Sequence, residues 1–156
     1  MKQILIVTLV LFICACNDTS PEQVDRKDGF TPLLKTTEDS LYHDVMEGHD
    51  IGMAKMSTLR GNLKRVQREL DSVQKLPVQK IDSPYMRALL DLQEELNYAD
   101  HAMFTWMGEF KVDSASSNKD KRIKYLESEK AKVEKVRDNI LNSLQRADSL
   151  FKSAGR

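Results

Sequence analysis

The segment "LPVQKIDSP", residues 76–84, decides the fold, because it ends one long helical pattern and begins another. Its two prolines cannot continue a helix from a preceding turn. Ser83 followed by Pro84 is typical of a helix start, with Ser83 as the N-cap and Pro84 at the first helical position. A connection this short places the two flanking helices side by side and in opposite directions.

Apolar residues upstream of this segment recur at alternating spacings of three and four, the heptad pattern of a helix that packs against other helices. The pattern predicts one helix over about 40–75, with Thr36 and Asp39 forming a capping box just before it. Its core positions are Tyr42, Val45, His49, Gly52, Met56, Leu59, Leu63, Val66, Leu70 and Val73.

The same spacing continues downstream and predicts two more helices, over about 84–111 and 118–153. The last is less regular, because Lys130 and Arg137 lie near its core phase. The basic group at 119–124 is expected to be a solvated helix start. The predicted core positions are Leu89, Leu92, Leu96, Ala99, Met103, Trp106 and Phe110, then Ile123, Leu126, Val133, Val136, Ile140, Leu144, Ala147 and Phe151.

These patterns predict an all-α protein, an antiparallel up-down-up three-helix bundle with coiled-coil-like packing over residues 40–156. No stretch shows the two-residue alternation of a β-strand. The alternative fold is a helical hairpin that dimerises, with Lys130 and Arg137 at an incompletely buried seam.

The N-terminus predicts a lipoprotein signal peptide over residues 1–15. The apolar run from Ile4 to Ile13 is far shorter than the roughly 20 residues that cross a membrane. It ends in "ICAC", residues 13–16, which resembles the lipobox of bacterial lipoproteins and points to lipidation of Cys16. The earlier cysteine is the weaker candidate, because a bulky residue precedes it. The alternative is an ordinary secreted protein with two chance cysteines.

Residues 16–39 are then expected to be a flexible, lipid-anchored tether, since they are polar and contain Pro21, Gly29 and Pro32. The anchor makes the membrane a partner, and we expect the periplasmic face of the outer membrane rather than the inner membrane or the cell surface. No cysteine follows Cys16, so the remaining chain offers no disulfide, thiol nucleophile or cysteine-bound zinc.

The charges balance, with 24 Lys and Arg against 24 Asp and Glu, which gives no electrostatic reason to bind nucleic acid. The glycines are scattered, no serine lies in a nucleophile elbow, and a thin bundle offers little concavity for a substrate. We therefore expect no enzyme and no cofactor. The expected function is a structural or protein-interaction role in the envelope, through self-association, the polar outer faces or the end that carries Tyr42 and Trp106.

A second hypothesis is a periplasmic binding site for a soft metal, Cu(I) or Ag(I). Thioether and imidazole groups suit such metals, and an indole face can cap a cation. The competing interpretation is core packing, in which methionines fill gaps and Gly48 and Gly52 make room for a large ring. Folding the hairpin brings five candidate ligands to one end of the bundle: Met46, His49, Met53, Trp106 and Met107.

Three stretches together resemble a known group of proteins: "LYHDVMEGHDIGMAKM" (41–56), "ELNYADHAMFTWMGEF" (95–110) and "YLESEKAKVEKVRDNILNSLQRADSLF" (125–151). With the lipobox, they are similar to small Bacteroidota lipoproteins labelled "viral A-type inclusion protein". The resemblance covers about residues 40–153 and implies helices behind a lipid anchor. It implies nothing about viruses, and it carries over no activity and no functional residues.

Overall fold

The computed structural model describes residues 34–155, in which every regular element is helical. The elements are α1 (Thr37–Met53), α2 (Met56–Gln74), the 3-10 turn η1 (Val78–Lys80), α3 (Ser83–Glu109) and α4 (Lys119–Ser153). The predicted all-α class is therefore confirmed for this part of the chain. The predicted signal peptide, the lipidated Cys16 and the tether as far as residue 33 lie outside the described residues. None of the helices described is long and apolar enough to cross a membrane.

The start of α1 follows from the predicted capping box. The Thr36 hydroxyl accepts a hydrogen bond from the Asp39 backbone N–H at 3.1 Å, and the Asp39 carboxylate accepts one from the Thr36 backbone N–H at 3.0 Å. Two N–H groups that have no partner within the helix are thereby satisfied. The helix consequently begins at Thr37, slightly earlier than the predicted boundary near residue 40.

Asp82, and not Ser83, caps α3. The Asp82 carboxylate accepts a hydrogen bond from the Tyr85 backbone N–H at 3.1 Å, which makes Ser83 the first helical residue and Pro84 the second. A carboxylate also interacts favourably with the positive end of the helix dipole. The prediction of Ser83 as the N-cap was wrong by one residue, because both residue types suit that position.

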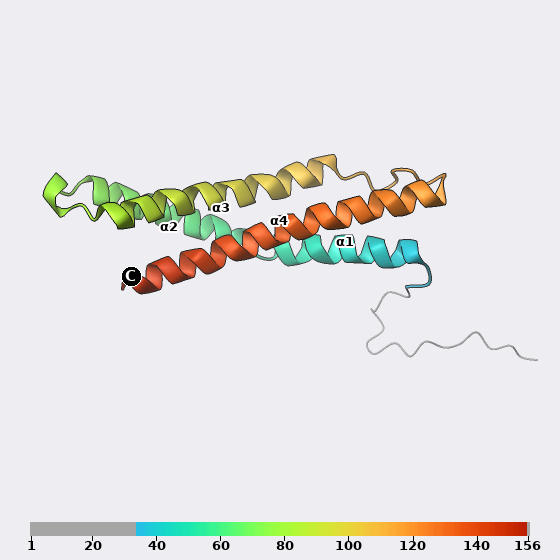
Figure 1. Cartoon of the computed structure of the whole chain (residues 1–156), viewed down its shortest axis with the longest axis horizontal. Helices are drawn as coiled ribbons and strands as arrows, with labels where there is room; N and C mark the ends of the chain where they lie inside the picture. Colours follow the sequence, from blue (N-terminus) through green and yellow to red (C-terminus); the bar gives the residue numbers. More distant parts are fainter. Residues whose placement is uncertain (1–33, 156) are drawn as a thin grey trace, which may run out of the picture. The chain divides into compact units, whose positions relative to one another are not determined.

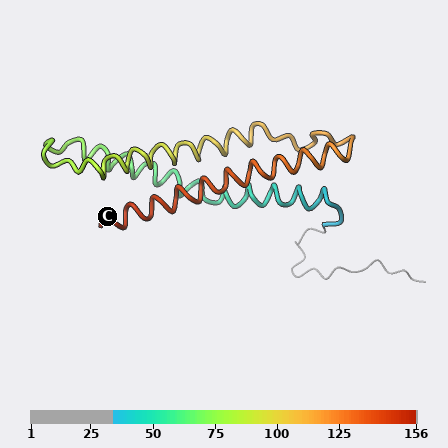
Figure 2. The backbone as a smooth tube through the Cα atoms, viewed as in Figure 1, coloured from blue at the N-terminus to red at the C-terminus, as the bar shows by residue number. Residues whose placement is uncertain are grey.

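The helix predicted over 40–75 is interrupted, which corrects the sequence-based boundary. Ala54 N–H still bonds to Asp50 O at 3.0 Å, but Lys55 N–H bonds to Gly52 O, only three residues back, at 3.0 Å. This tighter turn separates α1 from α2 and changes the direction of the chain (Figure 2). Buried residues keep their spacing across the turn, so the heptad pattern could not reveal it.

The four helices pack against one another (Figure 1). α1 lies mainly on α4 and α2 mainly on α3, while α1 and α3 touch only briefly. Between α2 and α3, residue numbers rise in one helix as they fall in the other, as the contacts Arg60–Asp100 and Gln67–Gln93 show. The same holds between α3 and α4, where the contacts are Trp106–Glu129 and Glu95–Arg146. Between α1 and α4 the numbers rise together, as Glu38–Arg122 and Asp44–Lys130 show.

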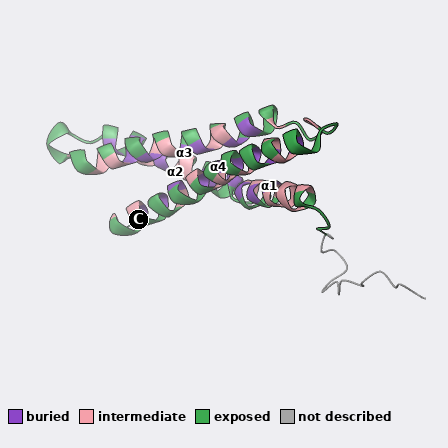
Figure 3. Cartoon of the chain, turned by 45° about the vertical axis from the view of Figure 1, so that its right-hand side comes forward, coloured by how far each residue is buried: buried purple, intermediate pink, exposed green. Residues whose placement is uncertain are grey.

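An aliphatic core follows the seam between the helices (Figure 3). Burying one large apolar side chain contributes about 1.5–3 kcal/mol before entropy is subtracted, so the core is the main stabilising term. Most of the predicted core positions are buried, and the partly exposed ones are Tyr42, His49, Leu63, Phe110, Ile123 and Leu144. The largest fully buried side chains include Leu59, Leu89, Leu92, Leu96, Met103, Leu126 and Ile140.

The cap of α3 gives a first prediction. Replacing Asp82 with Ala removes the acceptor for the Tyr85 N–H and should lower the free energy of unfolding by about 1 kcal/mol. Ser83→Ala is the matched control and should change it by less than about 0.5 kcal/mol. Urea unfolding followed by circular dichroism measures both. A larger loss for Ser83→Ala than for Asp82→Ala would contradict the assigned cap.

Candidate functional site

Trp106 lies at the centre of an aromatic cluster formed by α1, α3 and α4. Only 5% of its surface is exposed. The Phe110 ring stacks on the indole with centroids 5.0 Å apart, and the Tyr125 ring stacks on Phe110 at 6.2 Å. The His49 imidazole from α1 is tilted against the indole at 5.8 Å. Such ring pairs contribute about 0.5–1.5 kcal/mol beyond the area that they bury.

The indole N–H of Trp106 is paired with a buried carboxylate. Trp106 Nε1 donates to Glu129 Oε2 at 3.0 Å, and Lys132 Nζ donates to Glu129 Oε1 at 2.8 Å. Glu129 is only 3% exposed, so both of its oxygens are occupied inside the protein. The hydrogen bond to Glu129 raises the pKa of the Lys132 ammonium above its usual range.

Glu129 and Arg122 are the two buried charged residues that the sequence analysis missed. Both occupy the heptad frame of α4, whose buried positions are Arg122, Leu126, Glu129, Val133, Val136, Ile140, Ser143, Ala147 and Phe151. The apolar members of this frame already fix its phase, so extending the frame through polar positions would have found them. Arg122 was instead assigned to a solvated basic helix start, and the structure corrects that.

Arg122 connects the beginning of α1 with the loop before α4. Its Nε donates to Glu38 Oε1 at 3.0 Å, and its Nη1 donates to the Ser114 carbonyl at 3.0 Å. The phenol oxygen of Tyr125 accepts a hydrogen bond from the Lys111 backbone N–H at 2.7 Å. This end of the structure is therefore fixed by polar contacts as well as by apolar packing.

The structure brings some of the proposed soft-metal ligands together and not others. His49 reaches Trp106, and Met46 and Met53 are partly buried on α1. Met107 is 40% exposed, because it follows Trp106 directly and so projects about 100° around the helix from it. The His49 Nδ1 atom lies 2.8 Å from Asp50 Oδ1. With the indole N–H engaged and a ring stacked on the indole, this geometry favours packing, and the metal hypothesis stays a prediction.

A second group of possible ligands lies on α1. His43 and Glu47 share one face, and Asp44 joins them, so that one ligand atom from each lies within 4.8 Å of the others. Lys130 Nζ already lies 2.7 Å from Asp44 Oδ2, and this hydrogen bond lowers the pKa of the Asp44 carboxyl. We assign no metal to this group, because an ammonium group already occupies the carboxylate.

The burial of Trp106 also restricts which surface can meet a partner. The end of the bundle that carries Tyr42 and Trp106 was one expected contact surface. Trp106 contributes almost nothing to that surface, and Tyr42 is only partly exposed. An external partner must therefore bind elsewhere or rely on other residues.

The buried carboxylate gives a second prediction. Glu129→Ala leaves the indole N–H without an acceptor, and this should lower the free energy of unfolding by roughly 1–3 kcal/mol. Glu127→Ala, on an exposed position of the same helix, should change it by less than about 0.5 kcal/mol. Denaturant titrations followed by Trp106 fluorescence measure both. Equal effects of the two variants would show that the Glu129 contact contributes nothing to stability.

The metal hypothesis gives a third prediction. If the methionines are only packing groups, Met53→Leu and Met107→Leu should each change the free energy of unfolding by less than about 1.5 kcal/mol, and the wild type should fail to take Cu(I) from a weak chelator. Denaturant titrations measure the change in stability. Competition titrations against the chelator, with Trp106 fluorescence as the readout, measure Cu(I) binding. One-to-one binding that quenches Trp106, and that His49→Ala with Met53→Leu abolishes, would establish a soft-metal site instead.

Comparison with known proteins adds no family assignment. No protein-family model, no curated protein and no solved structure matches this chain. The resemblance to the Bacteroidota lipoproteins therefore stays a prediction from the sequence.

Proposed function

We propose that this chain is a lipid-anchored, antiparallel up-down-up bundle of the bacterial cell envelope that acts through protein contacts and not through catalysis. The "ICAC" motif at residues 13–16 supports attachment through Cys16, because several acyl chains hold a protein on a membrane effectively permanently. The directions of the polar contacts between helices support the bundle topology. The periplasmic face of the outer membrane is the proposed location.

A surface on α3 and α2 is the observation that carries the proposal of protein contacts. It consists of Phe104, Met107 and Gly108 on α3 and Arg60 on α2, and we call it the Phe104 surface. Phe104 is 46% exposed and Met107 is 40% exposed. The Arg60 guanidinium lies over the Phe104 ring at 5.0 Å from its centroid. Aromatic residues, Met and Arg are the residue types enriched where proteins meet.

Two glycines at exposed helix positions support the same proposal. A Cβ at Gly48 would lie 3.0 Å from Val133 Cγ1, so that glycine allows a close approach inside the bundle. A Cβ at Gly61, which follows Arg60 in α2, or at Gly108 would meet nothing within 4 Å among the described residues. Gly within a helix costs roughly 0.5–1 kcal/mol relative to Ala. Packing among the described residues therefore gives no reason for Gly61, and a partner that approaches closely there would supply one.

Site-specific photocrosslinking tests this proposal. A photoreactive residue at position 104 of the full chain, in the native envelope, should give a discrete protein adduct. The same residue at Leu90, which is 45% exposed on the same helix, is the matched control and should give none. An adduct of twice the chain mass would identify the partner as a second copy. No adduct at 104, or equal adducts at both positions, would contradict the proposed contact surface.

Gly61→Ala separates binding from folding in the same system. It should raise the free energy of unfolding of the isolated chain by about 0.5–1 kcal/mol and should weaken the adduct formed at position 104. A stabilised variant with an unchanged adduct would place the contact away from Gly61. The Cys16→Ser variant tests the anchor independently. Membrane fractionation should show that this variant is no longer attached to the membrane.

A further inference from the structure

A groove runs between α3 and α4, on residues that the proposed function does not use. Two adjoining hollows of about 380 and 310 Å³ share Tyr98 and Asn139 in their walls. Their linings follow the two rows of residues beside the core, at spacings of three and four. The row on α3 is Glu95, Tyr98, Ala102, Thr105 and Glu109, and the row on α4 is Lys132, Lys135, Asn139, Asn142 and Arg146.

The groove exists because the central position of each row carries a short side chain, Ala102 on α3 and Asn139 on α4. In helix bundles such flanking positions usually carry long charged residues that meet across the seam. They do so at one end, where Arg146 is paired with Glu95. At the other end the charges are again opposite, and the negative charge of Glu109 contributes to raising the pKa of Lys132. Between the ends, Ala102 and Asn139 cannot bridge the seam. The resulting trough spans residues 95–109 of α3, or about 20 Å at 1.5 Å per residue.

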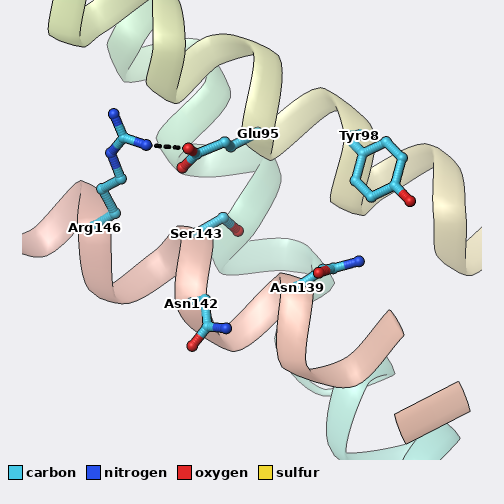
Figure 4. A pocket seen from close by; sticks show the side chains of 6 residues that line it. All are labelled: Glu95, Tyr98, Asn139, Asn142, Ser143 and Arg146. Atoms are coloured by element: carbon cyan, nitrogen blue, oxygen red, sulfur yellow. Dashed lines mark hydrogen bonds and ion pairs between the residues drawn. The ribbon is translucent and has the colours of Figure 1, made fainter. Parts of the chain in front are cut away.

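The polar groups in the first hollow have unused hydrogen-bonding capacity. Tyr98 extends from α3, and the amides of Asn139 and Asn142 extend from α4 (Figure 4). Tyr98 is 57% exposed. Neither amide, nor the Tyr98 hydroxyl, is hydrogen-bonded to another residue that the structure describes. Each amide offers two donors and an acceptor, so one hollow is lined both by an aromatic ring and by hydrogen-bonding amides.

We propose that this groove binds a neutral oligosaccharide. Sugar hydroxyls both donate and accept hydrogen bonds, which matches the free amides of Asn139 and Asn142, and the C–H face of a sugar ring can stack on Tyr98. The residues of the first hollow are aromatic or polar, which suits a ligand that has both an apolar ring face and hydroxyl groups. The pairing of Glu95 with Arg146 leaves this part of the groove without net charge.

The second hollow gives the ligand room to continue. Ala102 and Val136 contribute apolar lining there, while His101, Thr105 and Lys135 contribute polar groups. A second sugar unit can lie in this hollow, with an N-acetyl methyl group against the apolar side chains. The length of the trough therefore favours an oligomer over a single sugar.

The test uses the full chain in a non-glycosidic detergent, with chitotetraose and cellotetraose as N-acetylated and plain probes. Saturation-transfer NMR detects weak binding, and the side-chain amide signals of Asn139 and Asn142 report the place. At least one probe should bind and shift these two signals but not that of Asn97, which lies outside the lining. Tyr98→Ala and Asn142→Ala should each weaken binding by about tenfold or more.

Two further variants keep the interpretation clear. Asn97→Ala is the control for an exposed amide on α3 and should leave the affinity unchanged, and Tyr98→Phe should keep most of the binding because it retains the ring. Absence of binding by either sugar at millimolar concentration would overturn the proposal. So would binding that survives Tyr98→Ala. Binding of an extended peptide pool at the same amide signals, without sugar binding, would replace the saccharide with a protein segment.

Discussion

The close approach of α1 to α3 and α4 at Gly48 and Gly52 is the constraint on which the rest of the structure depends. A Cβ at Gly52 would lie 2.5 Å from the Met103 methyl group and 3.3 Å from Ile140 Cδ1. With only hydrogen at these positions, α1 can sit deep enough for His49 to reach Trp106 and for Asp44 to reach Lys130. Each glycine costs up to about 1 kcal/mol of helix propensity, and the packing that it permits offsets that cost.

Much of the fold could be predicted because it depends on spacing. The heptad positions of Leu59, Leu92 and Val133 are buried as the sequence indicates, and the capping box at Thr36 forms. The turn at Ala54 and Lys55 could not be predicted, since the apolar spacing passes through it unchanged. Local backbone hydrogen bonds decide that turn, and they leave no trace in a hydrophobic pattern.

The candidate site was harder to predict than the fold, because the direction in which each side chain points depends on single residues. The sequence brought His49 and Trp106 to the same end of the bundle, but its register set His49 opposite Phe110, whereas the imidazole lies against the Trp106 ring. It also could not tell that Met107 faces outwards on the same helix as Trp106. It also passed over Glu129, since a carboxylate is rarely buried unless it is paired. Its partner, the indole N–H of Trp106, comes from another helix. A buried pair of this kind is weak evidence of stability, but it can fix which helix faces meet.

The polar contacts along α1 have a mechanical consequence for any load applied at the N-terminal end of the helix. Arg122 holds Glu38 in the first turn, and Lys130 holds Asp44 farther along, both from α4. A pull along the helix axis loads these pairs together in shear, whereas a sideways pull reaches the Glu38 pair first. The guanidinium in that first pair is also anchored to the Ser114 carbonyl. The Glu38–Arg122 contact, which is nearest the load, is therefore also connected to the loop between α3 and α4. A force applied there is transmitted to this loop as well as along α1.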